Sequence, residues 1–395
     1  MSEPVFVAGV GMTEFSKPGA GPAYPQLGEE AIRLALADAG LGYDAIEQVY
    51  AGYVFGETSC GQRVVYGVGL TGVPVFNVNN ACASGSSALY LARQAVAAGE
   101  VDCALALGFE QMAKGAINVA TPDRPNSFDR HVGRLVAAGG RSDAPVLPQF
   151  YGFAAAEYME RYGATPETFA AIAVKARRHA AHNPKAVFRQ PLSIAEVMAS
   201  EPMAGPLTRL QACPPTCGAG AAVVCSAGFA RRHGLGRLVR IAGQAIRSDG
   251  GHPFDGDSMI ELVGAGMARA AALAAYAQAG VDPGDVPVLE LHDCFTINEL
   301  LTYEALGLAA PGEGGRLIAD GDNSYGGRHV TNPSGGLLSK GHPLGATGLA
   351  QCYELVTQLR GEAGARQVDG AGVAIQHNLG LGGACVVTVY ERAAA

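Results

Sequence analysis

Three short segments of the sequence place thiol or imidazole side chains in loops of small residues, where they could perform nucleophilic or acid–base chemistry. In the first, Asn77-Val-Asn-Asn-Ala-Cys82-Ala-Ser-Gly-Ser86, a cysteine lies between a predicted strand and a predicted helix. The dipole and free N–H groups of a helix N-terminus favour a thiolate, so Cys82 is a candidate nucleophile. Most cysteines instead act as small apolar fillers. We prefer that interpretation for Cys60, Cys103, Cys213, Cys225, Cys352 and Cys385.

The second segment, Leu289-Glu-Leu-His292-Asp293-Cys294-Phe295, follows a predicted buried strand. Several polar side chains directly after a buried strand are costly to bury unless they bind something. Ligands of α/β sheets commonly bind beyond the carboxyl ends of strands. We therefore favour catalytic roles for His292 and Cys294. For Asp293 we favour a capping role before the helix predicted over Phe295 to Leu306.

The third segment, Asn332 to Gly348, is the most Gly-rich loop of the chain and contains Gly-His342-Pro. Pro343 fits the first position of a helix, which would present His342 at the helix entrance. A phosphate-binding loop would need the order G-x-x-x-x-G-K-[ST], which this segment lacks. A second Gly-rich turn, His377 to Gly383, can offer backbone N–H groups to an oxyanion. We interpret six other histidines as surface or structural residues: His131, His179, His182, His233, His252 and His329.

The elements that must position these segments alternate between strands and helices, which predicts α/β layers around a largely buried sheet. Strands are predicted over Val5 to Val10, Ile46 to Val54, Phe76 to Asn79, Cys103 to Gly108 and Ala219 to Ser226. Helices are predicted over Leu27 to Ala39, Ser84 to Ala98, Tyr151 to Tyr162 and Pro166 to Ala180. Gly40 is expected to end the first helix.

The first pattern recurs later in the chain. The matched pairs are Ala35–Leu41 with Ala275–Val281, Cys82–Gly85 with His342–Gly345, and Cys103–Gly108 with Gly372–Gln376. Three matches in one order indicate an internal duplication, and chance similarity between Ala-rich helices is the alternative. In a pseudo-twofold pair, Cys82 and His342 would begin equivalent helices and face one another. The imidazole could then take the proton of the thiol.

The stretch from Ala113 to Pro206 is rich in Pro, Asp and Arg and reads as an insertion into this repeat. We therefore divide the chain into three parts. Residues 1–112 and 207–245 form an N-terminal half, residues 113–206 a loop domain, and residues 246–395 a C-terminal half.

Composition excludes several classes of protein. The 395 residues are 48% hydrophobic and 16% charged, unlike a disordered chain, and the net charge of −8 without a basic block argues against nucleic acid. Nine cysteines, an odd number, favour free thiols over a disulfide framework. The close pair Cys213 and Cys217 lacks the further ligands of a zinc site, so we expect no metal.

Targeting signals are also not evident. The N-terminus has no basic and apolar regions of a signal peptide. The longest weakly polar run, Met267 to Val281, is shorter than the ~20 residues that span a bilayer. We expect a soluble, intracellular protein that does not insert into membranes.

These segments together resemble the thiolase superfamily, in particular the sterol-carrier-protein type of 3-ketoacyl-CoA thiolase, whose relatives also carry the labels non-specific lipid-transfer protein and acetyl-CoA acetyltransferase. The resemblance covers essentially the whole chain. Its segments include Gly9 to Phe15, Tyr53 to Arg63, Asn332 to Cys352 and Gln376 to Ala384. His-Asp-Cys-Phe at 292–295, where most thiolases carry Asn-Glu-Ala-Phe, distinguishes this type. The implied fold is the duplicated five-layer α-β-α-β-α arrangement with an inserted loop domain.

The resemblance also implies residue roles. Cys82 would be the nucleophile that a 3-oxoacyl-CoA acylates. His342 would activate Cys82 and donate to the substrate thioester oxygen, and His292 would complete this first oxyanion hole. The amides of Cys82 and Gly380 would form a second oxyanion hole around the acyl-enzyme.

The second acid/base is expected to be Cys294. Other thiolases use the Cys of a Cys-x-Gly motif, and residues 378–380 read Asn-Leu-Gly here. Cys217 stands where the family usually has the Asp of Ser-Asp-Gly-Ala-Ala, and we expect loss of a structural carboxylate rather than of chemistry. The resemblance implies no cofactor, because CoA is a substrate.

The implied activity is CoA-dependent cleavage of a 3-oxoacyl-CoA, straight, branched or carrying a sterol side chain, to acetyl-CoA or propanoyl-CoA and a shortened acyl-CoA. Three alternatives stay open: the reverse condensation, a retro-aldolase or acyltransferase with an OB-fold partner protein, and a non-catalytic lipid-binding protein. The family implies a homodimer or tetramer. The chain ends in Ala-Ala-Ala rather than Ser-Lys-Leu, from which we expect a stand-alone, cytoplasmic bacterial enzyme.

Overall fold

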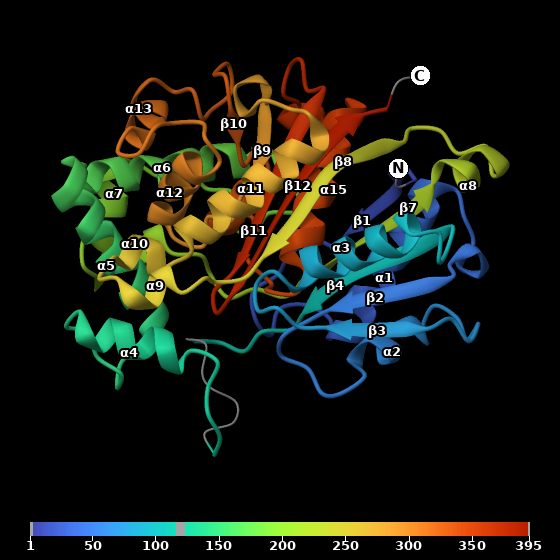
Figure 1. Cartoon of the computed structure of the whole chain (residues 1–395), viewed down its shortest axis with the longest axis horizontal. Coiled ribbons are helices and arrows are strands. Elements are labelled where there is room, and N and C mark those ends of the chain that lie inside the picture. Colours follow the sequence, from blue (N-terminus) through green and yellow to red (C-terminus); the bar gives the residue numbers. More distant parts are fainter. Residues whose placement is uncertain (1–2, 116–122, 394–395) are drawn as a thin grey trace.

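Within residues 3–115 and 123–393, which the computed structural model describes, ten strands form one mixed sheet in the order β10-β9-β11-β12-β8-β1-β7-β4-β2-β3 (Figure 1). The N-terminal five are β1 (Val5–Met12), β2 (Gln48–Gly52), β3 (Val75–Val78), β4 (Cys103–Glu110) and β7 (Gly218–Ser226). The C-terminal five are β8 (Val239–Arg247), β9 (Val288–Glu290), β10 (Val330–Thr331), β11 (Val373–Gly380) and β12 (Ala384–Arg392).

The two sets of five strands repeat one topology. In the first, β3, β2 and β4 are parallel, and β7 and β1 then follow in antiparallel pairs. In the second, β10, β9 and β11 are parallel, and β12 and β8 follow in antiparallel pairs. The sets meet where β1 pairs with β8 through Phe6 opposite Arg240 and Val7 opposite Val239. The predicted duplication is confirmed, because chance similarity between helices would not reproduce strand order and direction.

Helices form three layers around the two halves of the sheet. The middle layer contains α3 (Ser84–Ala97) and α15 (Thr347–Arg360), which contact each other and strands of both halves. Helix α1 (Tyr24–Ala39) covers β1 and β7, and α11 (Ala265–Ala279) covers β8 and β12. This gives the predicted five layers α-β-α-β-α.

Strand β4 shows why its sequence lacks polar alternation. Leu105 and Leu107 pack on the α1 side of the sheet, whereas Ala104 and Ala106 pack towards α3 and α15 in the middle layer. A strand covered on both faces reads as a continuous apolar run. The small alanines allow the middle helices to lie close to the strand.

Helix boundaries follow local signals closely. Helix α1 begins at Tyr24 rather than at the predicted Leu27, because Pro25 fits the first turn, where no backbone N–H is needed. Gly40 ends α1 and Gly280 ends α11, both in the left-handed region with φ 70° and ψ 30°. The matching ends are a further sign of the duplication.

The chain between β4 and β7 contributes helices that pack on the C-terminal half. They are α4 (Asp129–Ala137), α5 (Val146–Tyr162), α6 (Pro166–Ala180) and α7 (Ile194–Met198), followed by a hairpin of β5 (Pro202–Ala204) and β6 (Leu207–Thr208). Helix α6 has its predicted bounds, whereas α5 begins five residues before the predicted Tyr151. Both helices contact α12 (Thr296–Ala305), so this segment lies against the element that follows Cys294.

The other α-helices of the described chain are short. They are α2 (Cys60–Val65), α8 (Ala227–Arg232), α9 (His252–Asp255), α10 (Met259–Leu262), α13 (Gly314–Ala319) and α14 (Gly336–Ser339). In the part of the chain that the structure describes, no helix has the length and apolar character needed to cross a membrane.

Glycines allow the two halves to approach closely at the start of the middle helices. A Cβ at Gly85 of α3 would lie 2.5 Å from the carbonyl oxygen of Gly345, and a Cβ at Gly108 of β4 would lie 2.3 Å from the same oxygen. A Cβ at Gly348 of α15 would lie 2.1 Å from Ser86 Oγ. Side chains at these positions would separate the halves where Cys82 and His342 meet.

Candidate active site

The structure brings Cys82, His292 and His342 together at the carboxyl ends of parallel strands. One potential ligand atom from each residue lies within 4.8 Å of the other two. The two imidazole rings pack edge to face, with their centroids 4.9 Å apart. The three residues follow β3, β9 and β10, so strands of both halves contribute to one site.

The turn that carries Cys82 is sharp. Ala81 has a φ of 49°, a left-handed conformation that a non-Gly residue adopts at a cost of about 1–2 kcal/mol. Ser84 Oγ accepts a hydrogen bond from Asn80 N at 2.9 Å and donates one to Ala81 O at 2.7 Å, which holds the turn. Burial raises the pKa of Cys82 well above its usual value, and the charge of Cys294 adds to this effect. The thiol therefore needs a base to become a nucleophile.

His342 has a ring nitrogen that is free to accept a proton. Its backbone N donates to Thr216 Oγ1 at 2.7 Å, and its Nδ1 lies 2.7 Å from Thr347 Oγ1. Since the Thr347 hydroxyl donates its proton to Pro343 O at 3.0 Å, Nδ1 carries the imidazole proton and Nε2 has a free lone pair. Nε2 is buried and has no hydrogen-bond partner among the described residues. Burial lowers the pKa of His342 to about 3, so the ring is neutral at neutral pH.

His292 has the opposite tautomer. Gln376 Nε2 donates to Ser86 Oγ at 2.8 Å, and Ser86 Oγ donates to Asn378 Oδ1 at 2.8 Å. The Asn378 amide therefore turns its Nδ2 towards His292 Nδ1, at 3.1 Å. His292 Nδ1 accepts, so Nε2 carries the proton and can donate it to an oxyanion. Burial and the neighbouring imidazoles hold the pKa of His292 well below its usual value, which keeps the ring neutral.

Cys294 is suited to hold a proton until it is needed. Burial raises its pKa to about 12, and a hydrogen bond from Tyr151 opposes this shift. Asn298 Nδ2 lies 3.9 Å from Cys294 Sγ. Asn298 Nδ2 also donates to the carbonyl oxygen of His292, a ring nitrogen of which lies within 4.8 Å of the Cys82 sulfur, so Cys294 belongs to the same site. The charge of Cys294 raises the pKa of Cys82. A protonated thiol beside the nucleophile can act as a general acid.

Gly380 lies at the end of β11, against the Cys82 turn. A Cβ at Gly380 would lie 2.1 Å from Asn80 O and 3.0 Å from Ala83 N. Only glycine permits this approach, which brings the backbone of Gly380 beside the backbone of Cys82. The placement is compatible with the predicted second oxyanion hole.

Our prediction for Asp293 was wrong about the helix that it caps. Its carboxylate accepts from the backbone N of Leu337 at 2.7 Å and of Leu338 at 3.5 Å, at the start of α14 rather than α12. These hydrogen bonds join two different segments of the site, because α14 belongs to the loop that leads to His342. Asp293 therefore ties the Cys294 segment to the His342 loop.

Glu110 is a buried residue that the sequence analysis missed. It accepts hydrogen bonds from the backbone N of Val54, Phe55 and Gly345, each at 3.0 Å. It thereby links the end of β2 to the His342 loop. Burial raises the pKa of Glu110 to about 7.

The remaining seven cysteines differ in their surroundings. Cys60, Cys103, Cys225, Cys352 and Cys385 are buried, as expected of apolar fillers. Cys213 is only partly buried, and its backbone N donates to Cys294 O at 2.8 Å, so it lies beside the site rather than in a remote core. Cys217 stands where the family usually has an Asp. Its thiol, in place of a carboxylate, donates to Met112 O at 3.6 Å.

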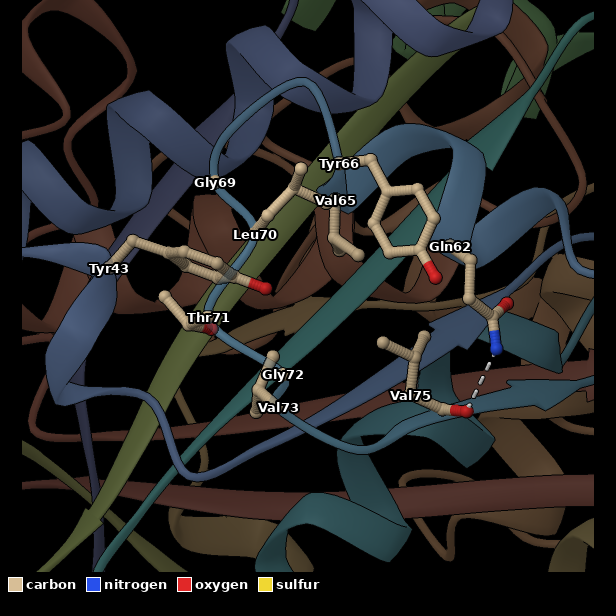
Figure 2. Close-up of a pocket in the computed structure, with 10 residues that line it drawn as sticks. All are labelled: Tyr43, Gln62, Val65, Tyr66, Gly69, Leu70, Thr71, Gly72, Val73 and Val75. Carbon is tan, nitrogen blue, oxygen red and sulfur yellow. Dashed lines mark hydrogen bonds between the residues drawn. The ribbon is translucent and has the colours of Figure 1, made fainter.

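A hollow of about 370 Å³ lies elsewhere, between α2, the chain that follows it and Val75 of β3 (Figure 2). Gln62 Nε2 donates to Val75 O across it at 3.3 Å. The hollow is lined by Tyr43, Gln62, Val65, Tyr66, Gly69, Leu70, Thr71, Gly72, Val73 and Val75, none of which belongs to the candidate site.

Comparison with known sequences gives the same picture for both halves of the chain. The thiolase N-terminal domain matches residues 5–227, and the thiolase C-terminal domain-like family matches residues 256–392. The chain is 52% identical to sterol carrier protein 2 of Homo sapiens over 391 residues, which cover 98% of this chain and 72% of that protein. It is 37% identical to the benzoylsuccinyl-CoA thiolase subunit BbsB of Thauera aromatica, over 92% of this chain and 91% of that one.

Comparison with solved structures supports the fold. An Ltp2–ChsH2(DUF35) aldolase structure matches with a TM-score of 0.83 and 28% identity, over 98% of both chains. Human mitochondrial 3-ketoacyl-CoA thiolase in complex with CoA matches with a TM-score of 0.74 and 19% identity, over 99% of this chain and 98% of that one. The predicted fold is confirmed, and the chain belongs to the thiolase family.

Proposed function

We propose that this protein is a 3-oxoacyl-CoA thiolase that cleaves its substrate through an acyl-enzyme on Cys82. The observation that carries the proposal is the pair of opposite tautomers. His342 offers a lone pair and His292 offers an N–H group, and one ring nitrogen of each lies within 4.8 Å of the Cys82 sulfur. Acyl transfer to a thiol requires a base for the nucleophile and a donor for the developing oxyanion.

In the first half-reaction, the Cys82 proton moves to His342 Nε2 as the sulfur attacks the 3-keto carbon. The amides of Cys82 and Gly380 stabilise the resulting alkoxide. When the C2–C3 bond breaks, the enolate oxygen accepts hydrogen bonds from the Nε2–H groups of His292 and of protonated His342. Cys294 gives its proton to C2, which releases acetyl-CoA or propanoyl-CoA.

In the second half-reaction, the thiol of CoA gives its proton to the Cys294 thiolate and attacks the acyl group on Cys82. The Cys82 sulfur leaves and recovers its proton from His342. Both sulfurs and both histidines then return to their starting states. The substrates that we propose are 3-oxoacyl-CoA esters, including branched or sterol-side-chain esters, as in β-oxidation, and the proposed location is cytoplasmic.

The proposal is tested by comparing wild type with Cys82→Ala and Cys294→Ala. Wild type soaked in a 3-oxoacyl-CoA should gain the mass of the shortened acyl group in intact-mass spectra. Cys82→Ala should gain none and lose at least ~10³-fold in CoA-dependent cleavage. Cys294→Ala should lose about 10²- to 10⁴-fold. Cys60→Ala, a buried cysteine of α2, controls for stability, and cleavage that survives Cys82→Ala would contradict the proposal.

A second candidate is an aldol-type cleavage with an OB-fold partner protein. It is favoured by the likeness to the Ltp2–ChsH2(DUF35) aldolase structure. Such an enzyme would release a free aldehyde or ketone without CoA and without an adduct on Cys82. The same spectra and a carbonyl assay of the products therefore separate the two candidates from each other and from simple lipid binding.

We also propose a homodimer that joins β3 strands. β3 ends the sheet and, among the described strands, pairs with β2 alone. Phe76 of β3 is 46% exposed, and Tyr66 and Leu70, which line the hollow together with Val75 of β3, are 57% and 79% exposed. An uncovered apolar edge invites pairing with another chain. Light scattering should give a dimer mass for wild type and a lower mass for Phe76→Glu, and a monomeric wild type would refute the proposal.

A further inference from the structure

Tyr151 connects the segment between β4 and β7 to the candidate active site. The residue is buried in α5, and its ring stacks on that of Phe295, with the centroids 4.6 Å apart and the planes 22° apart. Phe295 directly follows Cys294. The stack therefore fixes the direction of the Tyr151 ring relative to the Cys294 sulfur.

The Tyr151 hydroxyl interacts with Cys294, the residue before the stacked Phe295. It hydrogen-bonds to Cys294, and the charges of Cys294, Cys82 and Cys213 all act on it. Burial, reinforced by these groups, raises the pKa of Tyr151 well above its usual value. The phenol therefore stays protonated and acts towards Cys294 as a hydrogen-bond donor.

A second donor lies at the same sulfur. Asn298 Nδ2 is 3.9 Å from Cys294 Sγ, and the same group donates to the carbonyl oxygen of His292. Asn298 is in the first turn of α12, whereas Tyr151 comes from α5. Burial alone makes a thiolate at Cys294 costly. Hydrogen-bond donors from two separate elements, α5 and α12, would offset this cost.

We propose that Tyr151 is a positioning residue for proton transfer by Cys294. The Tyr151 hydroxyl stabilises the Cys294 thiolate that remains after the proton has moved to C2. The inference rests on the proposed thiolase function. In the step, the S–H bond of Cys294 breaks and the C2–H bond forms, while the O–H bond of Tyr151 stays intact. Tyr151 keeps the cost of the thiolate low without exchanging a proton itself.

The substitution that tests this is Tyr151→Phe, which keeps the stacked ring and removes only the hydroxyl. Tyr158→Phe is the matched control, since Tyr158 is also buried in α5 but its hydroxyl bonds to Glu304. We expect CoA-dependent cleavage to fall about 10- to 100-fold in Tyr151→Phe, because a hydrogen bond to a charged group is lost. Exchange of the α-hydrogens of acetyl-CoA into D₂O should fall by a similar factor.

A readout at the sulfur separates a chemical effect from a structural one. Alkylation of Cys294 by iodoacetamide at pH 8.5, located by peptide mass spectrometry, follows its thiolate fraction. In Tyr151→Phe this rate should fall about 3- to 10-fold at unchanged melting temperature, while Tyr158→Phe should alkylate like wild type. Equal alkylation and α-hydrogen exchange in Tyr151→Phe and wild type would overturn the proposal.

The alkylation measurement does not require turnover. If wild type forms no adduct on Cys82 but Tyr151→Phe still slows alkylation of Cys294, the proposed function fails and the link between Tyr151 and Cys294 stands. If the adduct forms and alkylation is unchanged, the function stands and the role of Tyr151 fails.

Discussion

The turns that deliver Cys82 and His342 begin the equivalent helices α3 and α15, but they differ in length and in how they are held. Between β3 and α3 the chain is short and kept in place by one serine and a left-handed Ala81. Between β10 and α15 the chain is long enough to contain α14, and buried polar groups from elsewhere hold it. The duplicated scaffold fixes where the helices start, and the unequal loops decide which chemistry each start presents.

Each middle helix also contributes one hydroxyl that sets the tautomer of a histidine. Ser86 of α3 acts through Asn378 to leave a proton on Nε2 of His292. Thr347 of α15 acts directly and leaves a lone pair on Nε2 of His342. Equivalent helices thus produce a donor on one side and a base on the other, which a symmetric pair of halves would not provide.

The largest effect is expected from Asn378→Asp, which should abolish the difference in tautomer between His292 and His342. A carboxylate accepts at every position, so His292 would place its proton on Nδ1 and lose the donor at Nε2. Loss of one oxyanion donor predicts a fall of about 10²- to 10³-fold in kcat. Steady-state kinetics of Asn378→Asp, His292→Ala and the double variant measure it. Additive losses would show that Asn378 does not act through His292.

A smaller effect is expected from Thr347→Val, which changes the surroundings of His342. The substitution removes the acceptor of the His342 Nδ1 proton but keeps the shape of the side chain. We predict about a 10-fold lower rate of Cys82 acylation, because the ring is less firmly oriented. Thr357→Val is the control, as Thr357 Oγ1 also donates to a backbone carbonyl within α15 but lies away from the site. Equal rates in the two variants would refute the role of Thr347.

The smallest effect is expected on the free energy of unfolding. It concerns Glu110, which links the two halves through its hydrogen bond to Gly345. Burial raises the pKa of Glu110 from 4.5 to about 7, so between these pH values the folded protein holds a proton that the unfolded chain releases. The contribution of Glu110 is fully present below pH 4.5 and is lost as the pH rises through 7. In Glu110→Gln this loss should disappear, a change of about 1.4 kcal/mol per pH unit in the unfolding free energy.

Urea unfolding at several pH values between 4.5 and 8 measures this slope, and the exposed Glu14→Gln serves as control. Parallel pH profiles of wild type and Glu110→Gln would contradict the prediction. The slope rather than the absolute stability is compared, because the substitution also changes hydrogen bonds to Gly345.

The sequence predicts most of the fold, because the signals involved are local. Gly40 and Gly280, apolar strands and Pro166 mark element ends within one or two residues. The internal repeat also predicts that Cys82 and His342 meet. Helix α5 is the main exception, since its first turn before Tyr151 carries no capping residue and is stabilised by tertiary packing.

The groups that tune the site are less accessible to prediction. Asn298 follows Cys294 at a helical spacing that local reasoning could have used. In contrast, Thr216 contacts His342 across 126 residues, and Ser86 contacts Asn378 across 292. No periodicity encodes such contacts. For the same reason the carboxylate of Asp293 was assigned to the adjacent helix rather than to the distant α14.

The carbonyl oxygen of Gly345 occupies the space that a methyl group at Gly85 or Gly108 would need. An inherited change that adds even one carbon atom there would push apart the helix starts that carry the thiol and the imidazole, although neither glycine belongs to the candidate site. The backbone of the second half therefore limits which residues the first half can carry at these two positions. Two fragments from a gene cut between the halves would rebuild the candidate site only if they restored this contact when they assembled.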